Sequence, residues 1–284
     1  MTVPAGETRI VTLDPTTSWD GVLFELAACD SATCSSNADD SASGGNEQLT
    51  FVNTGATDAT HIIGVQAYSG AGGTFTLTVA EPPYTQTAIS EACVDVSAGT
   101  ALGSTTVDDA MSPGAMLPFA FSFFGTPVTH WRASTNGWMQ LSASSSFGAT
   151  DTFAGFSNDR IPTSDDPDGV IAPFWDDLRP RTGANITQLV TGAAGSQMLV
   201  VQWSQWRPSS SGGEDLTFQV VLHESTSVIE LRYCSLTNSG SGSLHTGSSA
   251  TIGIENLDGS DGVLTSFETA DAVMTGSGFR YTPN

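Results

Sequence analysis

The sequence predicts an all-β protein made of two β-sandwich domains in tandem, both jelly-roll-like. Short apolar runs are separated by turn residues, as between residues 118 and 178, where PFAFSFFG, STNGWMQLS and IAPFWDDL follow one another. Such runs recur about every ten residues along the chain, which is typical of a sandwich. Several of them alternate apolar and polar side chains, as half-buried strands do. No amphipathic helix of three turns is found in residues 1–81.

The first predicted domain covers residues 1–81. In its last segment, GTFTLTVA, the apolar residues Phe75, Leu77 and Val79 face one way and the threonines face the other. Residues 82–91 contain paired prolines and are predicted to form an extended linker. The strands expected in this domain are Thr8–Leu13, Val22–Ala27, Leu49–Val52, His61–Ala67 and Gly73–Val79.

The second predicted domain covers residues 92–284. Leu216–His223 alternates apolar and polar side chains, and a turn joins it to Val228–Cys234 in a hairpin. The pattern of short strands and turns continues to the end of the chain, which favours a larger sandwich. The other strands expected are Phe119–Phe124, Val128–Ala133, Gly137–Ser142, Val170–Phe174, Ile186–Val190, Met198–Trp206, Ser249–Ile254, Leu264–Phe267 and Gly278–Thr282.

The charge of the chain excludes several classes of partner. It has 30 acidic residues and 8 basic ones, all of them arginine, for a net charge of −22. Such a charge repels phosphate backbones and anionic lipid surfaces, so we expect no nucleic-acid binding. No apolar run approaches the roughly 20 residues that span a bilayer, so we expect no membrane insertion. The absence of lysine also excludes Schiff-base chemistry and a P-loop.

The four cysteines predict two disulfides. Cys29 and Cys34 lie close together in a loop without histidine, so a local disulfide is favoured over a zinc site. Cys93 and Cys234 would then join the start of the second domain to a late strand. Two disulfides indicate an oxidising compartment. The alternative is that the cysteines are free, buried thiols.

Residues 1–80 resemble the bacterial pre-peptidase C-terminal domain. The resemblance is carried by VPAGETRIVTL, by the CDSATC pair after an apolar strand, and by EQLTFVNTG and GGTFTLTV. It implies a secreted, jelly-roll-like β-sandwich that is attached to proteases and other exported proteins and is itself non-catalytic. Some members of that family bind calcium through acidic loops.

Residues 118–233 resemble the nidogen-like extracellular domain and related modules of secreted bacterial proteins. The residues that carry this resemblance are FAFSFFG, STNGWMQL, NDRIP, IAPFWDDL, LVVQWSQW, FQVVLHE and IELRY. The resemblance implies an adhesion or matrix component without known catalytic residues. It therefore indicates where the protein works and to which class it belongs.

The histidines do not form a catalytic motif. His61, His130, His223 and His245 all stand outside any H-E-x-x-H or G-x-S-x-G frame. The serines cluster in turn-rich segments, where serine is a turn former. Adjacent carboxylates, such as those at 176–177, point to opposite faces of a strand and would not flank a glycosidic bond. We therefore do not expect an enzyme, and a hydrolase is the last alternative.

Two acidic loops are candidates for binding Ca²⁺. The loop TSDDPDG carries Asp165, Asp166 and Asp168, and the loop ENLDGSDG carries Asp258 and Asp261. Closely spaced carboxylates on a tight loop suit Ca²⁺, although neither loop completes an EF-hand pattern. The alternative is that these aspartates cap their own turns.

An exposed tryptophan is the remaining candidate for a binding residue. Trp203 and Trp206 are three residues apart, so they should point to opposite faces of a strand. Trp203 is expected in the core, whereas Trp206, beside Arg207 at the strand end, is the candidate contact for a polysaccharide or a protein partner. The alternative is that all five tryptophans of the second domain fill its core.

Together these features predict a non-catalytic module that is secreted to the extracellular space or the cell surface. No export signal is seen in the chain, which we interpret as a trimmed start or as a piece of a longer protein. Its expected role is adhesion, surface or matrix structure, or self-assembly into a fibre or coat through protein partners or copies of itself. Open sheet edges without lysine leave lateral strand pairing available. The alternative is a carbohydrate-binding or accessory domain of a secreted hydrolase or protease.

Overall fold

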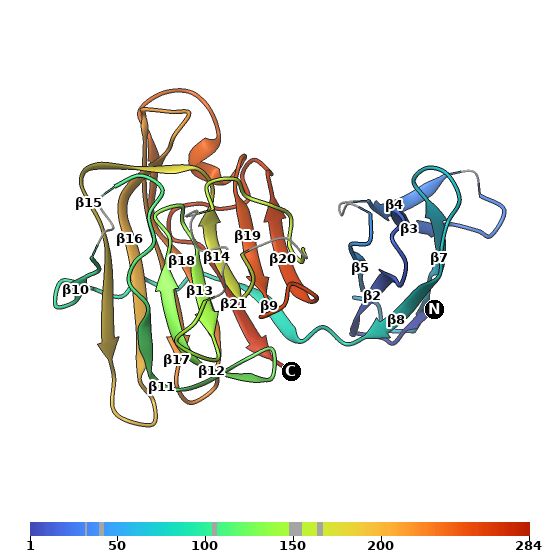
Figure 1. The fold of residues 1–284 in the computed structure, drawn as a ribbon, viewed down its shortest axis with the longest axis horizontal. Coiled ribbons are helices and arrows are strands. Elements are labelled where there is room, and N and C mark those ends of the chain that lie inside the picture. The colour runs from blue at the N-terminus through green and yellow to red at the C-terminus, as the bar shows by residue number, and fades with distance from the viewer. Residues whose placement is uncertain (32, 40–42, 104–106, 148–154, 164–166) are drawn as a thin grey trace. The chain divides into compact units, whose positions relative to one another are not determined.

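The computed structural model describes residues 1–31, 33–39, 43–103, 107–147, 155–163 and 167–284 (Figure 1). The described elements are strands, apart from one short 3₁₀ turn at Leu244–Thr246, so the all-β prediction is confirmed. Backbone contacts divide the chain into two compact units, Met1–Pro82 and Pro83–Asn284. Within the described residues, no helix has the length and apolar character needed to cross a membrane.

The first unit consists of two three-stranded sheets and one short two-stranded ribbon. A small apolar core lies among them and includes Val11, Leu23 and Phe51. The strand orders are β5 (Glu47–Val52), β2 (Thr8–Pro15), β8 (Phe75–Ala80) in one sheet, β4 (Cys34–Ala38), β3 (Gly21–Leu26), β7 (Ile62–Ala67) in the other, and β1 (Thr2–Val3) with β6 (Ala59–Thr60) in the ribbon.

The apolar row on β8 is more exposed than the sequence suggests. Leu77 lies opposite Leu13 and Val79 lies opposite Val11, so the row faces the same side as these buried residues. Phe75, Leu77 and Val79 nevertheless remain 44, 41 and 51% exposed. The reason is that β8 is the end strand of its sheet and pairs with β2 alone among the described strands.

The predicted bond between Cys29 and Cys34 is wrong, because both residues are free, exposed thiols. Cys34 begins β4 and lies opposite Leu26, the last residue of β3. Cys29 lies farther out in the loop, inside a turn in which the Ser31 N–H donates to the Ala28 carbonyl at 3.0 Å. The hairpin loop is therefore closed by strand pairing and by this turn, without a sulfur bridge.

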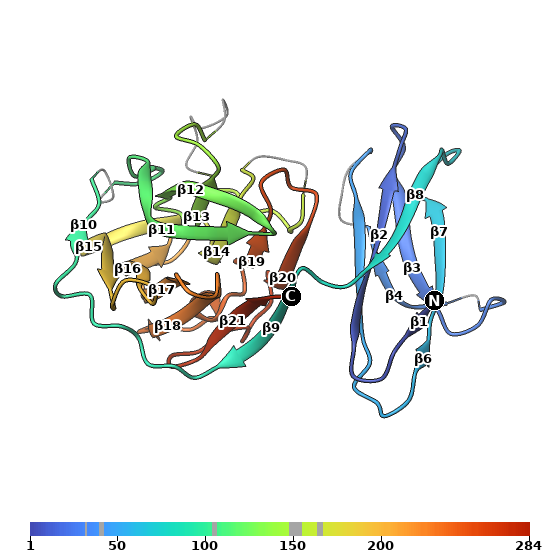
Figure 2. The same ribbon diagram turned by 90° about the horizontal axis from the view of Figure 1, so that it is seen from below.

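The second unit is a sandwich of two antiparallel sheets, seen as two layers in Figure 2. One sheet has seven strands in the order β10 (Thr100–Ala101), β15 (Leu178–Thr191), β16 (Met198–Pro208), β17 (Glu214–His223), β18 (Ile229–Asn238), β21 (Gly278–Pro283), β9 (Tyr84–Ile89). The other has six, in the order β11 (Ala115–Phe123), β12 (Thr126–Ala133), β13 (Met139–Ser142), β14 (Val170–Trp175), β19 (Thr251–Glu255), β20 (Gly262–Phe267).

Most of the segment predicted as a linker, 82–91, is a strand of this sandwich. β9 pairs with the last strand of the chain, β21, from Tyr84 opposite Pro283 to Ile89 opposite Gly278. The Tyr84 ring is buried, and its hydroxyl accepts a hydrogen bond from the backbone N–H of Phe124 at 3.2 Å. The sequence of β9 is polar because most of its other side chains face solvent, which is why it resembles a linker.

Stacked aromatic rings fill the space between the two sheets. Phe218 of β17 stacks on Trp203 of β16 and on Phe174 of β14, with ring centroids 5.3 and 5.7 Å apart. The indole N–H of Trp203 donates to the carbonyl oxygen of Ser134 at 2.7 Å, so its one polar group is satisfied within the core. The core of this unit is thus closely packed by residues from both sheets.

The segment after β9 crosses the outer face of the seven-stranded sheet (Figure 2). Two hydrogen bonds from the side chain of Gln219 hold this segment on the sheet. The Oε1 of Gln219 accepts from the N–H of Val94 at 3.0 Å, and its Nε2 donates to the carbonyl oxygen of Val94 at 2.7 Å. The predicted disulfide between Cys93 and Cys234 is present and joins the same segment to β18. The segment is therefore a fixed part of the sandwich.

Glu230 is a buried acid on the same outer face. Arg232 donates to it through Nε at 2.8 Å, Arg280 does so at 2.8 Å, and His223 lies 3.4 Å away. Burial alone would raise the pKa of Glu230, but the nearby His223 and the hydrogen-bonded guanidinium groups of Arg232 and Arg280 prevail and lower it to about 2. The carboxylate is therefore charged and paired over the usual range of pH.

We expect acid to weaken the second unit through Glu230. The ordinary pKa of this group is 4.5 and the folded value is about 2, so the unfolded chain binds the proton more tightly. The stabilisation is fully present above about pH 4.5 and is lost as the pH falls toward 2, by up to about 1.4 kcal/mol per pH unit. Denaturant unfolding between these pH values should show this slope, and Glu230→Gln should reduce it. An equal slope in both proteins would contradict the prediction.

Candidate functional site

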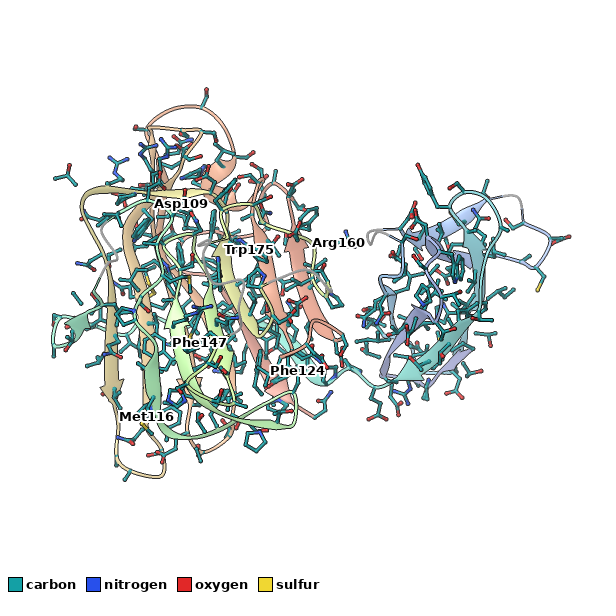
Figure 3. All side chains as sticks on the ribbon, in the orientation of Figure 1. Asp109, Met116, Phe124, Phe147, Arg160 and Trp175 are labelled. Atoms are coloured by element: carbon teal, nitrogen blue, oxygen red, sulfur yellow. A yellow bond between two sulfur atoms is a disulfide. The ribbon has the colours of Figure 1, made fainter. Side chains whose placement is uncertain are left out.

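Residues 155–163, in the connection from β13 to β14, lie on the outer face of the six-stranded sheet. Trp138 and Trp175 are buried on that face, with ring centroids 6.0 Å apart, and Figure 3 shows Trp175. Both indole N–H groups donate to the carbonyl oxygen of Gly155, at 3.3 and 2.8 Å. Ile161 packs in the same apolar cluster. These contacts hold the described part of the connection on the sheet as far as Thr163.

The pairing of β14 with β19 brings the two predicted calcium loops together. The strands are antiparallel neighbours with Ile171 opposite Ile254, so the residues before β14 lie beside those after β19. The N–H of Gly169 donates to the carbonyl oxygen of Asn256 at 2.7 Å. The described ends of the first loop, which include Asp168, thus lie beside the second loop, about ninety residues later in the sequence, and form one acidic junction with it.

Glu255 lies beneath this junction and was not among the predicted residues. It ends β19, is 0% exposed, and accepts a hydrogen bond at Oε1 from the N–H of Thr163 at 2.5 Å. Its Oε2 has no hydrogen-bond partner within the described residues. Burial raises the pKa of Glu255 to about 9, and the charges of Asp168, Asp159 and Asp258 contribute to this rise. The junction therefore contains a buried acid among other acids.

The absence of a side chain at Gly259 lets oxygen atoms of the first loop lie close to the backbone of the second loop. Its φ of +67° is in the left-handed region, and a side chain there would meet the segment before β14. A Cβ atom would lie 2.0 Å from the carbonyl oxygen of Thr163 and 2.7 Å from Oδ1 of Asp168. Two oxygen atoms from the first loop thus converge on the glycine of the second.

The turn-capping alternative describes Asp258 well. Its Oδ1 accepts hydrogen bonds from Ser260, from Oγ at 2.6 Å and from the N–H at 3.2 Å, and these lower the pKa of Asp258. Asp261 donates its N–H to the side chain of Asn256 at 3.3 Å within the same turn. The two other predicted ligands, Asp165 and Asp166, lie outside the described residues.

A second acidic cluster lies elsewhere in this unit. Asp108, Asp109 and Asp177 place one carboxylate oxygen each within 4.8 Å of one another. Arg179 forms an ion pair with Asp108 at 3.1 Å, and Asn136 donates to Asp109 at 2.9 Å. Figure 3 shows Asp109 at one end of the unit and Met116 at the other. The carboxylates of this cluster are therefore already paired with a positive charge and with a hydrogen-bond donor. The sequence patterns did not indicate that these three residues lie together.

The prediction that Trp206 is exposed is wrong. Trp206 is fully buried, and its indole N–H donates to the carbonyl oxygen of Asn185 at 3.2 Å. A β-bulge lies between Trp203 and Trp206, where Gln205 has a φ of +60°. The extra residue turns both tryptophans to the same face. All five tryptophans of this unit are buried, as the alternative held, three in the core between the sheets and two, Trp138 and Trp175, in the outer cluster. Trp206 is therefore a core residue.

Arg207 lies in an open, polar pocket of ≈ 410 Å³ beside this bulge. Its Nη1 donates to the carbonyl oxygens of Pro208 and Ser211. Arg181 lines the same pocket and donates to the Glu214 carbonyl at 2.5 Å. The pocket is lined by Pro180, Arg181, Thr182, Gln205, Arg207, Gly212 and Asp215. It offers hydrogen-bond donors without an exposed aromatic platform.

The fold and its disulfide define a β-sandwich module of a kind common outside cells. A comparison with protein-family models matches residues 83–280 to the family described as NIDO related. Because this match covers well over half of the chain, the chain belongs to the NIDO-related family. No curated protein and no solved structure matches the chain.

The family match supports the nidogen-like resemblance of the second domain and is consistent with an extracellular location. It does not extend to residues 1–81, whose resemblance to the pre-peptidase C-terminal domain stays a prediction. The comparisons thus give the class of the module.

Proposed function

We propose that this protein is a non-catalytic extracellular module that builds a surface, matrix, fibre or coat by associating with copies of itself. The NIDO-related match over residues 83–280 supports the extracellular class. The packed aromatic core and the disulfide give the second unit a rigid frame, which suits a structural role. An enzyme is not part of this proposal.

The observation that carries self-association is the edge strand β8. It ends its sheet and exposes the apolar row of Phe75, Leu77 and Val79. An edge strand of this kind is a template for pairing with another chain, and natural proteins often block such edges with lysine. The chain has no lysine, so this protection is absent from β8. A second copy would pair along the strand and cover the apolar row.

Self-association through β8 can be tested with the whole chain by light scattering and electron microscopy at micromolar concentration. We expect oligomers or filaments from the unaltered protein, and a shift toward monomer in Leu77→Lys, because a charge on the edge opposes strand pairing. Met116→Lys is the matched control, since Met116 is also exposed but lies in the second unit. Monomers alone in the unaltered protein would overturn the proposal.

A second candidate function is that of a carbohydrate-binding or accessory domain of a secreted hydrolase or protease. The pocket around Arg207 and Arg181 supports it, because guanidinium groups, amides and a carboxylate can form hydrogen bonds with the hydroxyl groups of a sugar. Retention on polysaccharides that falls in Arg207→Ala would favour this candidate over self-assembly.

A further inference from the structure

Within the described residues, Glu255 lacks the positive partner that a buried carboxylate needs. A charged group taken out of water is costly unless it is paired and hydrogen-bonded. Glu230, the comparable acid of the other sheet, pairs with Arg232 and Arg280. Glu255 forms no ion pair within the described residues, and only one of its two oxygens accepts a hydrogen bond. Its position thus requires either a proton or a cation.

The groups around Glu255 offer oxygen atoms that can bind a metal ion. The backbone N–H of Thr163 occupies Oε1, and the carbonyl oxygen of the same residue converges with Oδ1 of Asp168 on Gly259. Asp159 and Asp258 are near enough for their charges to act on Glu255. Carboxylate and carbonyl oxygens from two adjoining loops are the ligands that Ca²⁺ takes in proteins.

We propose that Glu255, Asp168 and the carbonyl oxygen of Thr163 bind Ca²⁺, which joins the segment before β14 to the β19–β20 turn. The observation that separates this junction from an ordinary acidic turn is the fully buried carboxylate of Glu255, whose Oε2 has no hydrogen-bond partner in the part of the chain that the structure describes. The inference is independent of self-association, since it concerns the second unit alone.

Ca²⁺ fits the junction better than Mg²⁺ does. Ca²⁺ accepts six to eight oxygens in irregular arrangements, whereas Mg²⁺ demands a near-octahedral shell and usually keeps several waters. The donors here come from a side chain at a strand end, a side chain in a loop and a backbone carbonyl, held by two separate segments. Such a set is better matched by the more flexible shell of Ca²⁺.

Calorimetric titration of the chelator-treated full chain with CaCl₂, and separately with MgCl₂, tests the proposal. We expect saturable Ca²⁺ binding in the range of extracellular modules, about 0.1 to 1 mM. We also expect thermal unfolding to shift to higher temperature with Ca²⁺, because the ion binds the folded state. Mg²⁺ should give a smaller shift. The absence of saturable Ca²⁺ binding would mean that Glu255 is simply protonated, and would overturn the proposal.

Two variants and one control locate the ion. Glu255→Gln keeps an oxygen for the N–H of Thr163 but removes the charge, so it should fold and bind Ca²⁺ about tenfold or more weakly. Asp168→Asn should weaken binding as well. Asp109→Asn alters the other acidic cluster and should bind Ca²⁺ like the unaltered protein. It should also fold normally, since asparagine tolerates the positive φ of that residue. Affinity unchanged in the first two variants, or lost in the control, would contradict this site, and circular dichroism checks that each variant is folded.

Discussion

Replacing Cys93 and Cys234 with serine should lower the free energy of unfolding of the second unit by about 5 kcal/mol in the chain-entropy model. The bond closes a loop with a sequence separation of 141 residues, so its loss greatly increases the freedom of the unfolded chain. The serine variant should unfold at clearly lower denaturant concentration, with a steeper dependence on denaturant, because its unfolded chain is no longer cross-linked and exposes more surface.

The free cysteines supply a matched control for this experiment. Cys29→Ser with Cys34→Ser also removes two thiols, but these are unbonded and exposed in the first unit, so we expect little change. A loss below about 1 kcal/mol on removing the disulfide would contradict the prediction. It would mean that the hydrogen bonds of Gln219 and Arg232 to the same segment are sufficient to hold it.

The strands could be predicted from the sequence because alternation is a local property. The segment Leu216–His223 lies within β17, and the hairpin with β18 is present. Local patterns do not reveal which strands lie at an edge. The row at Phe75 has the alternation of a core strand, yet it is exposed because nothing beyond β8 continues its sheet among the described strands.

The wrong predictions from the sequence occur where one extra residue changes the register of a strand, or where the strand that pairs with a segment lies far away in the sequence. Gln205 adds a residue to β16 and thereby turns Trp206 into the core, a change that strict alternation cannot show. β9 is a strand because β21, almost two hundred residues later, pairs with it. Neither the bulge in β16 nor the distant partner of β9 can be recognised from the local sequence of these strands.

The acidic junction was predictable in part. Both loops have the composition of calcium loops, but only the adjacency of β14 and β19 brings them together. Glu255 follows Ile254, which faces the core, so alternation places it on the opposite face, where solvent is expected. The segment near Thr163 covers that face and buries the side chain. Burial by a distant connection is a tertiary effect that the sequence does not show.

Trp203→Ala should destabilise the second unit by about 3–5 kcal/mol, because it removes a fully buried ring from the centre of the sandwich. The cavity would lie next to Phe218, whose stacking on both Trp203 and Phe174 connects the two sheets. The change would also leave the carbonyl oxygen of Ser134 without its indole donor, which adds to the loss. Denaturant unfolding followed by circular dichroism measures the effect.

Trp203→Phe separates packing from hydrogen bonding. Phenylalanine can still stack on Phe218 but cannot donate to Ser134, so we expect a loss clearly smaller than that of alanine, yet above zero. Met116→Ala is the matched control, since Met116 is 72% exposed and its truncation leaves no cavity. If Trp203→Ala were no more damaging than Met116→Ala, the ring could not be part of a close-packed core. The aromatic stack would then not be what joins the two sheets.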